Sequence, residues 1–453
     1  MRTSPVRFVA WALLLWTVSA NPWRALDSRQ RLHDHIDRRH LKFHRRNANA
    51  SLPNPIRGVN IGSWLLLEKW MVPDFFNGTN ATDQHSFDST PGARAKLRYH
   101  WQTYFTEDDV KKIASWGINA LRIPIGYWAY DNSGTPYIKG ADAYLEKAIG
   151  WARKYSLKVL VDCHGSPGSQ NGFDNSGQSG VVKWQTPGNM NKSIAVLEKM
   201  ARKYGNMNYS DVVFGIELTN EPIAWDTPGG GNSFNRTKEW TKSAYKVVRA
   251  AADNKNLLIV MHDSFQTPKS WLDVHAVLNS NYTTPRFAMD THLYQNMVDG
   301  DNYLDQDEHI AKACNWATTD LLPRNSTLPV FVGEFSAQTN ICAYQNGTVT
   351  PGRFDPEGPI NECYEKGCFC SANTDPKYYE YIPPLLDATR AYLEAELDTF
   401  EYASRGWFFW SYKGPGLWGL QNLFEHGVLG SLTGKVTDRH FPNQCGLPSP
   451  SYR

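Results

Sequence analysis

The sequence alternates short apolar runs with longer stretches of helical periodicity, and this alternation constrains the fold more than any other feature. Parallel strands are joined by crossover helices, so such a pattern is typical of a parallel sheet. The predicted strands are Ile56–Asn60, Ala120–Ile125, Lys158–His164, Val212–Asn220, Leu257–His262, Phe287–His292, Pro329–Glu334 and Gly406–Ser411.

Helical patterns lie between these strands. The clearest of them are Glu107–Trp116, Ala141–Tyr155, Ile194–Tyr204, Thr237–Ala252 and Asp387–Tyr402. Eight strands with intervening helices predict an α/β fold of the TIM barrel type, a (β/α)8 barrel with long loops around its cleft. A doubly wound open sheet is the alternative, but no Gly-x-Gly-x-x-Gly motif follows the first strand.

Polar, aromatic or titratable residues stand at the carboxyl end of nearly every predicted strand. A barrel builds its active site from this end of its strands, so these residues are expected to converge on one site. They are Asn60, Arg122, His164, Asn220, Glu221, His262, Asp263, His292, Tyr294, Glu334 and Trp410.

Two of these residues are glutamates on the fourth and seventh strands. Glu221 lies in Asn-Glu-Pro and Glu334 in Gly-Glu-Phe, and each follows an apolar run that places it at the mouth of a buried strand. Either one alone is more often a salt-bridged loop carboxylate. Two carboxylates that flank one bond are what glycoside hydrolysis needs, one as acid and one as nucleophile or base.

Several segments give the chain a resemblance to a known family. They are Arg57 to Trp64, Leu121 to Pro124, His164-Gly165, Gly168 to Gly177, Asn220 to Pro222, Gly333 to Ser336, Trp407 to Ser411 and Phe441 to Gly446. In this combination and order the chain resembles glycoside hydrolase family 5, and within it the fungal-type exo-β-1,3-glucanases. The resemblance covers about Pro55 to Gly446.

The resemblance implies a retaining mechanism, with Glu221 as acid/base and Glu334 as nucleophile. Arg122 and Tyr294 are expected to hold Glu334 ionised, which leaves the proton on Glu221. An arginine inside Ala-Leu-Arg-Ile-Pro-Ile is in any case expected to have a buried partner.

The resemblance also implies a set of substrate-binding residues. Around the sugar in the cleaving subsite it places His164, Asn220 and His292; around the terminal glucose it places Glu68, Trp70, Asp174 and Asn175. Trp410 is expected to form the floor and Phe173 one side of an aromatic clamp. A phenylalanine that the family places opposite Phe173 is replaced by Met297.

The first 20 residues have the layout of a secretory signal peptide. Arg2 and Arg7 precede an apolar run, and Val18-Ser19-Ala20 resembles a cleavage site. A transmembrane anchor is the alternative, but the run is shorter than the roughly 20 residues that a span needs. We interpret residues 21–50 as a basic leader, flexible or processed after Arg46, and expect residues 51–453 to form a single catalytic domain.

Sequons and cysteines also predict a secreted glycoprotein. The sequons lie at Asn49, Asn77, Asn80, Asn191, Asn208, Asn235, Asn281, Asn325 and Asn346. Cysteines 342, 363, 368 and 370 crowd one polar stretch and are expected to form disulfides of undetermined pairing, with zinc binding as the alternative. The resemblance implies a bridge between Cys314 and Cys445, and Cys163 is expected to be a free core thiol.

These features together predict a secreted, extracellular or cell-wall enzyme that releases glucose from β-1,3-glucan, with transglucosylation as a possible side reaction. Another family 5 β-glycosidase, such as a β-1,6-glucanase, and a non-catalytic glucan-binding protein are the alternatives. No cofactor or metal is expected, since no His-x-His or His-Glu-x-x-His cluster occurs within residues 51–453. The near balance of 47 basic and 45 acidic residues argues against nucleic acid as a partner, and we expect a monomer without a stable membrane span.

Overall fold

A computed structural model describes residues 52–296, 299–323, 326–352, 363–370, 381–429 and 435–447. The predicted signal peptide and basic leader, the sequons at Asn49 and Asn325, and Met297 all lie outside these residues. In the part of the chain that the structure describes, no helix has the length and apolar character needed to cross a membrane.

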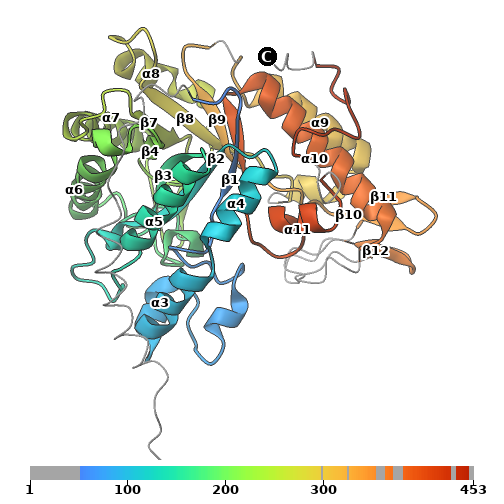
Figure 1. Ribbon diagram of the computed structural model, residues 1–453, viewed down its shortest axis with the longest axis horizontal. Coiled ribbons are helices and arrows are strands. Elements are labelled where there is room, and N and C mark those ends of the chain that lie inside the picture. The colour runs from blue at the N-terminus through green and yellow to red at the C-terminus, as the bar shows by residue number, and fades with distance from the viewer. Residues whose placement is uncertain are drawn as a thin grey trace, which may run out of the picture. The chain divides into compact units, whose positions relative to one another are not determined.

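Eight parallel strands close into a barrel, which confirms the predicted fold (Figure 1). Their order around the barrel is β1-β13-β9-β8-β7-β4-β3-β2. Their bounds are β1 Ile56–Asn60, β2 Ala120–Gly126, β3 Lys158–Gly165, β4 Val213–Glu217, β7 Leu258–His262, β8 Phe287–His292, β9 Val330–Glu334 and β13 Gly406–Phe409.

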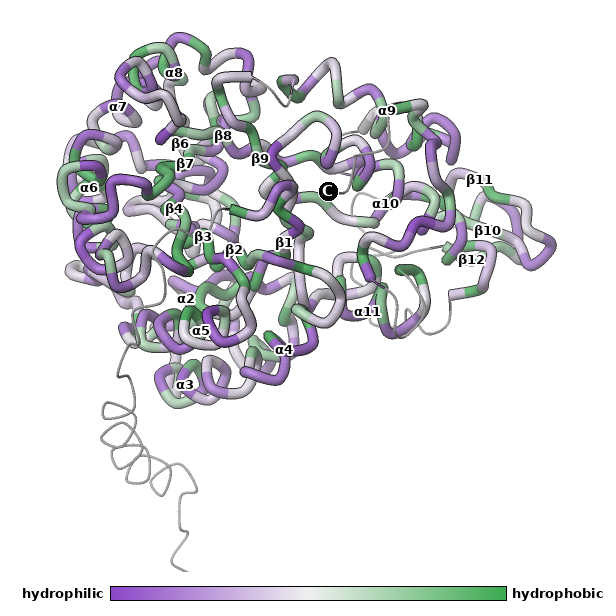
Figure 2. The backbone as a smooth tube through the Cα atoms, turned by 45° about the horizontal axis from the view of Figure 1, so that its top comes forward, coloured by the Kyte–Doolittle hydropathy of each residue, from purple (hydrophilic) through white to green (hydrophobic). Residues whose placement is uncertain are grey.

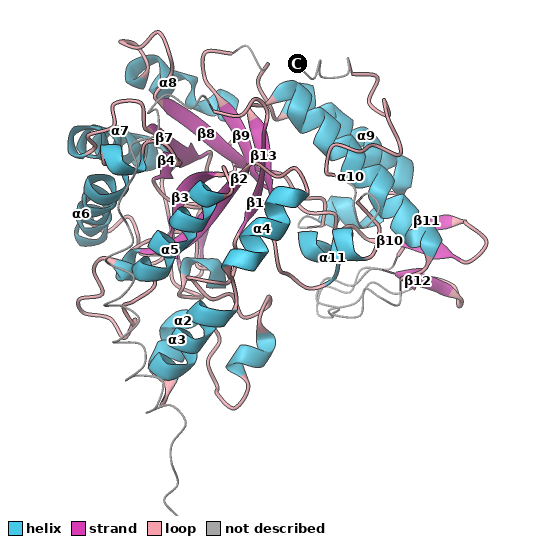
Figure 3. Ribbon diagram, in the orientation of Figure 1, coloured by secondary structure: helices cyan, strands magenta, loops and turns pink. Residues whose placement is uncertain are grey.

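Helices follow each strand and surround the barrel, as Figure 3 shows in cyan. They are α2 Gln84–Asp88, α3 Ala93–Thr103, α4 Glu107–Ser115, α5 Asp142–Lys154, α6 Pro187–Tyr204, α7 Phe234–Ala251, α8 Leu272–Leu278, α9 Gln306–Thr319, α10 Pro383–Ala403 and α11 Leu420–Glu425. The sequence starts α4 with a capping box, in which Asp109 accepts a hydrogen bond from the backbone N–H of Thr106. Helices α6 and α10 begin earlier than predicted because Pro187, Pro383 and Pro384 suit a first helical turn.

Two apolar layers hold the barrel. One fills the interior and contains Ile56, Ala120, Leu160, Phe214, Leu258, Val260, Ala288, Phe331 and Phe408. A larger cluster fills the space between the strands and the helices. Figure 2 shows hydrophobic colour along strands such as β4 and hydrophilic colour on the outer turns of helices such as α4.

Two breaks in strand register determine which side chains face the barrel interior. Val159 pairs with Val213 but Leu160 pairs with Gly215, so β4 carries an extra residue and Glu217 comes to lie opposite Asp162. Likewise Thr291 pairs with Val332 but His292 pairs with Glu334, so β9 carries an extra residue at this point. A bulge of this kind re-aims the side chains that follow it. Here the two breaks place Glu217 and Glu334 beside inward-facing residues of the neighbouring strands.

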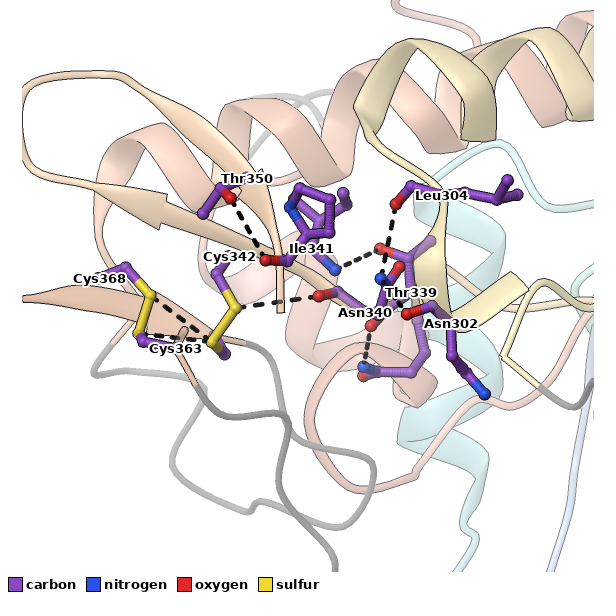
Figure 4. The surroundings of a disulfide bond; sticks show 12 residues. Asn302, Leu304, Thr339, Asn340, Ile341, Cys342, Thr350, Cys363 and Cys368 are labelled. Atoms are coloured by element: carbon purple, nitrogen blue, oxygen red, sulfur yellow. Dashed lines mark hydrogen bonds between the residues drawn. A yellow bond between two sulfur atoms is a disulfide. The ribbon is translucent and has the colours of Figure 1, made fainter. Parts of the chain in front are cut away.

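A small antiparallel sheet follows β9 and carries the loop disulfides. It consists of β10 Ile341–Tyr344, β11 Val349–Pro351 and β12 Cys368–Cys370. Cys342 pairs with Cys370, and Cys363 pairs with Cys368; Figure 4 shows Cys363 and Cys368 close to Cys342. The Cys314–Cys445 bridge and the free, buried thiol of Cys163 are as predicted.

Candidate active site

The carboxyl ends of the barrel strands bring the predicted residues together. Strand β4 ends at Glu217, three residues earlier than predicted, so Glu221 lies in the following loop rather than at the strand end. Its backbone has φ 44°, in the left-handed region that non-glycine residues rarely adopt. Strain of this kind is typical of residues that a functional site holds in one orientation.

Glu334, the last residue of β9, is held by two donors. Arg122 Nη1 donates to Glu334 Oε1 at 2.8 Å, and the Tyr294 hydroxyl donates to Oε2 at 2.9 Å. Arg122 lies on β2, across the barrel from β9, and Tyr294 lies in the loop after the neighbouring strand β8. A carboxylate with two such donors is fixed in position and can present its oxygen to a substrate in one direction.

Glu221 has a different set of partners. Its Oε1 atom lies 2.7 Å from His292 Nδ1, and its Oε2 atom accepts a hydrogen bond of 2.7 Å from Asn175 Nδ2. Asn175 belongs to the loop after β3, and His292 is the last residue of β8. Three different parts of the barrel therefore meet at this carboxylate.

His292 links the two glutamates. The same Nδ1 atom that contacts Glu221 lies 3.4 Å from Glu334 Oε2. The two nearest carboxylate oxygens can therefore be no farther apart than about 6 Å, which fits the ~5–5.5 Å of retaining glycosidases better than the ~6.5–9.5 Å of inverting ones. This geometry allows a double displacement at a carbon bound between them.

The pKa values of the pair are shifted in opposite directions. Burial raises the pKa of Glu334 and the charge of Glu221 adds to this, although His292 and Arg122 oppose it. Burial also acts to raise the pKa of Glu221, but the hydrogen bond and charge of His292 outweigh it and lower the pKa. These directions differ from the expectation that Glu221 is the protonated member of the pair in the free protein.

His292 is the reason for this reversal. Burial acts to lower the pKa of His292, but the charges of Glu334 and Asp290 and the hydrogen bond to Glu221 raise it well above its ordinary value. A proton held on His292 Nδ1 therefore lies within reach of Glu221 Oε1, across a contact of 2.7 Å. Its transfer to Glu221 Oε1 would convert an ion pair into a neutral pair with the same number of protons.

His164, Asn220 and Trp410 lie together beside the pair. His164 Nδ1 contacts Asp162 Oδ2 at 2.6 Å, and this bond leaves Nε2 to accept from Asn220 Nδ2 at 3.3 Å. The ring of Trp410 lies parallel to that of His164, with centroids 5.5 Å apart. Trp410 directly follows β13 and is only 2% exposed, so neighbouring rings cover most of its surface.

Carboxylates and aromatic rings from the loops after β1 and β3 line one side of the site. Glu68 accepts a hydrogen bond from Trp70 Nε1, and its Oε1 atom has no hydrogen-bond partner among the described residues. Burial raises the pKa of Glu68, and the charges of Asp174 and Glu334 add to the effect. Burial also raises the pKa of Asp174 to about 6.

The same loop after β3 carries the remaining predicted residues. Asp174 Oδ2 accepts from the backbone N–H of Lys69 at 3.0 Å, and Asn175 reaches Glu221. Phe173 precedes them and is 44% exposed, as an aromatic group at the rim of a cleft would be. Twelve of the thirteen predicted site residues thus lie at the barrel strand ends or in the loops that follow them, and Arg122 lies within β2.

Several residues of this region were not predicted from the sequence. Trp418 packs against Trp70 and Tyr294, with ring centroids 5.1 and 5.4 Å apart, and belongs to the same aromatic cluster as Trp410. Asp162, Glu217 and Asp290 are fully buried around Arg122. Charged residues inside otherwise apolar strands are the signal that could have identified the last three.

Glu221, His262 and His292 also form a group whose spacing could suit a metal ion. His262 Nδ1 accepts a hydrogen bond from the backbone N–H of Ser264, so a neutral His262 carries its proton on Nε2. Burial lowers the pKa of His262 well below its ordinary value, which keeps it neutral. Neither ring nitrogen of His262 then offers a free lone pair, and the group fits proton transfer better than metal binding.

Comparisons with known proteins give consistent similarities. The sequence profile described as cellulase, glycosyl hydrolase family 5, matches residues 81–349. The chain is 36% identical to the glucan 1,3-β-glucosidase of Pichia angusta over 86% of this chain and 89% of the relative. It is also 36% identical to the probable glucan 1,3-β-glucosidase A of Emericella nidulans, over 88% of this chain and 95% of the relative.

Solved structures support the fold. The crystal structure of rutinosidase from Aspergillus niger matches 83% of this chain and 98% of its own, with a TM-score of 0.62 and 20% sequence identity. The structure titled AoRut matches with the same TM-score at 22% identity. At these identities the similarity concerns the barrel architecture alone.

Proposed function

The chain belongs to glycosyl hydrolase family 5, and on this premise we propose that it is a retaining exo-β-1,3-glucanase that releases glucose from the non-reducing ends of β-1,3-glucans. The observation that carries the proposal is the meeting of Glu221 and Glu334 at one nitrogen of His292. The glucan 1,3-β-glucosidase relatives, matched over nearly their whole length, support the substrate class.

In the first step Glu334 attacks the anomeric carbon and the glycosidic oxygen leaves. A bond forms between Glu334 and the sugar, and the bond to the leaving oxygen breaks. The leaving oxygen takes a proton from Glu221, which Glu221 receives from His292 Nδ1 across their 2.7 Å contact as the leaving group approaches. Because His292 holds this proton within hydrogen-bond reach of Glu221, Glu221 can act as acid although its own pKa is lowered in the free enzyme.

In the second step a water molecule hydrolyses the glucosyl-enzyme. Glu221, now ionised, takes a proton from the water, and the hydroxide oxygen displaces Glu334 from the anomeric carbon. Two inversions leave the released glucose in the β configuration. A sugar hydroxyl in place of water gives transglucosylation by the same step.

The remaining predicted residues bind the terminal glucose. His164, Asn220 and Trp410 surround the sugar being cleaved, and the unpartnered Glu68 Oε1 atom accepts from a sugar hydroxyl together with Asp174. Trp70 supports this side, and Phe173 contacts the leaving sugar from the rim. Each of these groups offers either hydrogen-bonding atoms or a flat apolar face, as sugar binding requires.

Two joined loops explain why only a chain end is cleaved. The loops after β1 and β3 are tied by three hydrogen bonds, from Lys69 N to Asp174 Oδ2, from His85 N to Gly177 O and from Ser179 N to Asp83 Oδ2. These contacts hold a wall on the side of Glu68 and Asp174. A polysaccharide that ends at this wall loses one glucose at a time.

Product analysis on laminarin, a β-1,3-glucan, tests this proposal. We expect glucose as the first soluble product, with only a slow fall in viscosity, because the wall prevents binding in the middle of a chain. An early mixture of oligosaccharides would contradict exo action. A clear preference for a β-1,6-glucan in the same assay would keep the glycosidase but overturn the linkage assignment.

The pH profile of kcat/KM tests the role of Tyr294. Since the pKa of Glu334 is raised above its ordinary value, activity should be lost as the pH falls through that raised pKa. Tyr294→Phe removes a hydrogen bond that favours the ionised form of Glu334. The acid limb of the profile, where activity falls at low pH, should therefore move up by about one pH unit. An unchanged acid limb on an aryl β-glucoside would contradict this role.

The enzyme acts outside the cell, in the medium or the cell wall, after removal of residues 1–20 and processing of the leader, and residues 51–453 form its catalytic domain. It works as a monomer on β-glucan.

Disulfides on the barrel and its loop support an oxidising compartment. The sequon asparagines among the described residues all have exposed side chains, namely Asn77, Asn80, Asn191, Asn208, Asn235, Asn281 and Asn346.

A further inference from the structure

A buried layer of charged groups lies inside the barrel, with Arg122 at its centre and Glu334 as one of its members. Arg122 is surrounded by the carboxylates of Asp162, Glu217, Asp290 and Glu334, whose side chains are at most 5% exposed. Arg122 and a protonated His292, which contacts Asp290 and Glu334, supply two positive charges against four carboxylates, and unpaired buried charge is costly. An arrangement this costly points to a functional constraint rather than to stability alone.

Glu217 differs from the other members of this layer by its geometry. Its Oε2 atom accepts from Arg122 Nε at 2.8 Å and its Oε1 atom from Arg122 Nη2 at 3.2 Å, a bidentate contact. Asp162 and Asp290 each approach Arg122 through one oxygen, at 3.2 and 3.6 Å. A bidentate contact fixes the plane of a guanidinium, whereas a single contact lets it turn.

The plane that Glu217 fixes determines where the other N–H groups of Arg122 point. Nη1 donates to Asn60 Oδ1 at 3.0 Å and to Glu334 Oε1 at 2.8 Å. Nη2 donates to Asn220 Oδ1 at 2.8 Å. Together with the two bonds to Glu217, these bonds give each of the five N–H groups of Arg122 an acceptor, and one of these acceptors is Glu334.

The bulge in β4 is what turns Glu217 toward Arg122. It brings Glu217 opposite Asp162 on the inner face, where two like charges side by side are unfavourable without a cation between them. Gly333 of β9 leaves room for the layer, since a Cβ atom there would lie 1.9 Å from Asp290 Oδ2. Both strands therefore depart from regular register or composition where the layer forms.

We propose that Glu217 is a positioning residue, which holds Arg122 in the orientation that keeps Glu334 ionised and aimed at the substrate. The inference rests on the proposed glycosidase function. Glu217 lies beneath Arg122 and acts through it. Burial raises the pKa of Glu217, with Asp162 and Asp290 adding and Arg122 opposing, so acidification also weakens this contact.

The test is the variant Glu217→Gln, assayed on 4-nitrophenyl β-glucoside across the pH range. An amide of the same shape accepts from one N–H of Arg122 but turns its NH2 group toward another, so Arg122 rotates away from Glu334. We expect kcat to fall about 10- to 100-fold with KM nearly unchanged, and the acid limb of the profile to move to higher pH. Glu217→Asp, which keeps the charge, should restore part of kcat.

The matched control is Glu401→Gln. Glu401 is equally buried and makes the same bidentate contact, with Arg57 Nε at 2.7 Å and Nη2 at 2.9 Å, outside the catalytic layer. This variant should lose stability but keep kcat and the acid limb. In an Arg122→Lys background, Glu217→Gln should cause no further loss, since a residue that acts through Arg122 has nothing left to orient.

Three outcomes would overturn the inference. The first is a Glu217→Gln variant in which neither kcat nor the acid limb changes. The second is an acid limb that moves to lower pH, which the simple loss of a negative charge would cause. The third is a loss of kcat in the Arg122→Lys, Glu217→Gln double variant that equals the product of the two single losses. If Glu217→Gln does not fold, Glu217→Asp must itself show a lower kcat and a raised acid limb. A wild-type protein that leaves the aryl glucoside intact would instead refute the proposed function.

Discussion

Glu334→Ala is expected to abolish activity on every β-glucoside, whatever its leaving group. Without this carboxylate no glucosyl-enzyme can form, and kcat should fall by about 10⁴-fold or more, as it does when other enzymes lose a nucleophile. The loss should be equal for laminarin and for aryl β-glucosides with acidic leaving groups. Initial rates on such a series measure it directly.

Adding azide to the Glu334→Ala variant tests whether the residue removed was the nucleophile. A small anion can enter the space that the carboxylate occupied and attack an activated β-glucoside once, which gives an α-glucosyl azide. The folded state is checked by the melting temperature, because Glu334 is buried and bonded to Arg122 and Tyr294. A β-glucosyl azide from this variant would assign the acid/base role to Glu334.

Glu221→Ala is expected to act selectively. General acid catalysis contributes about 10²–10⁴-fold, so laminarin, whose leaving oxygen is a poor leaving group, should lose that much in kcat/KM. An aryl glucoside with an acidic phenol hardly needs the proton, and its first step should proceed. The glucosyl-enzyme should then accumulate, which a rapid burst of phenol followed by slow turnover would reveal.

Azide should restore turnover in this variant and give the β-glucosyl azide. It needs no base and attacks the intermediate from the face that Glu221 left open. Asn175→Ala is a suitable companion variant, since Asn175 donates to Glu221 but leaves the carboxylate in place. Equal losses on laminarin and aryl glucosides, without a response to azide, would contradict the acid/base assignment.

Most of the fold could be predicted from the sequence because a closed parallel barrel has strong local signals. Its strands are buried on both faces and read as short apolar runs, and the polar residues after them mark one end of the barrel. Phe287–His292 and Ile56–Asn60 were predicted with the bounds that the structure has. The convergence of Glu221, Glu334, Arg122, His292 and Tyr294 followed from the same logic.

The register breaks could not be predicted, and they determine the inner charged layer. Periodicity of two along β4 gives no sign of the extra residue between Val213 and Gly215, so Glu217 had no predicted direction. The lowered pKa of Glu221 was not predicted for a related reason. It depends on His292 lying 2.7 Å from Glu221, a distance that no spacing in the sequence contains.

The pairing of the loop cysteines was equally beyond sequence reasoning. Four cysteines in one polar stretch allow three pairings, and spacing does not choose among them. The antiparallel pairing of β10 with β12 sets Cys342 opposite Cys370, and this leaves Cys363 for Cys368.

The configuration of the first glucose released by the intact enzyme tests the central claim most directly. Proton NMR, recorded within minutes of adding enzyme to laminarin, separates the anomeric signals of α- and β-glucose before they equilibrate. Retention through Glu334 predicts β-glucose first, with the α signal rising only as mutarotation proceeds. If α-glucose appears first, the two carboxylates do not act by double displacement and the mechanism proposed for Glu221 and Glu334 is wrong.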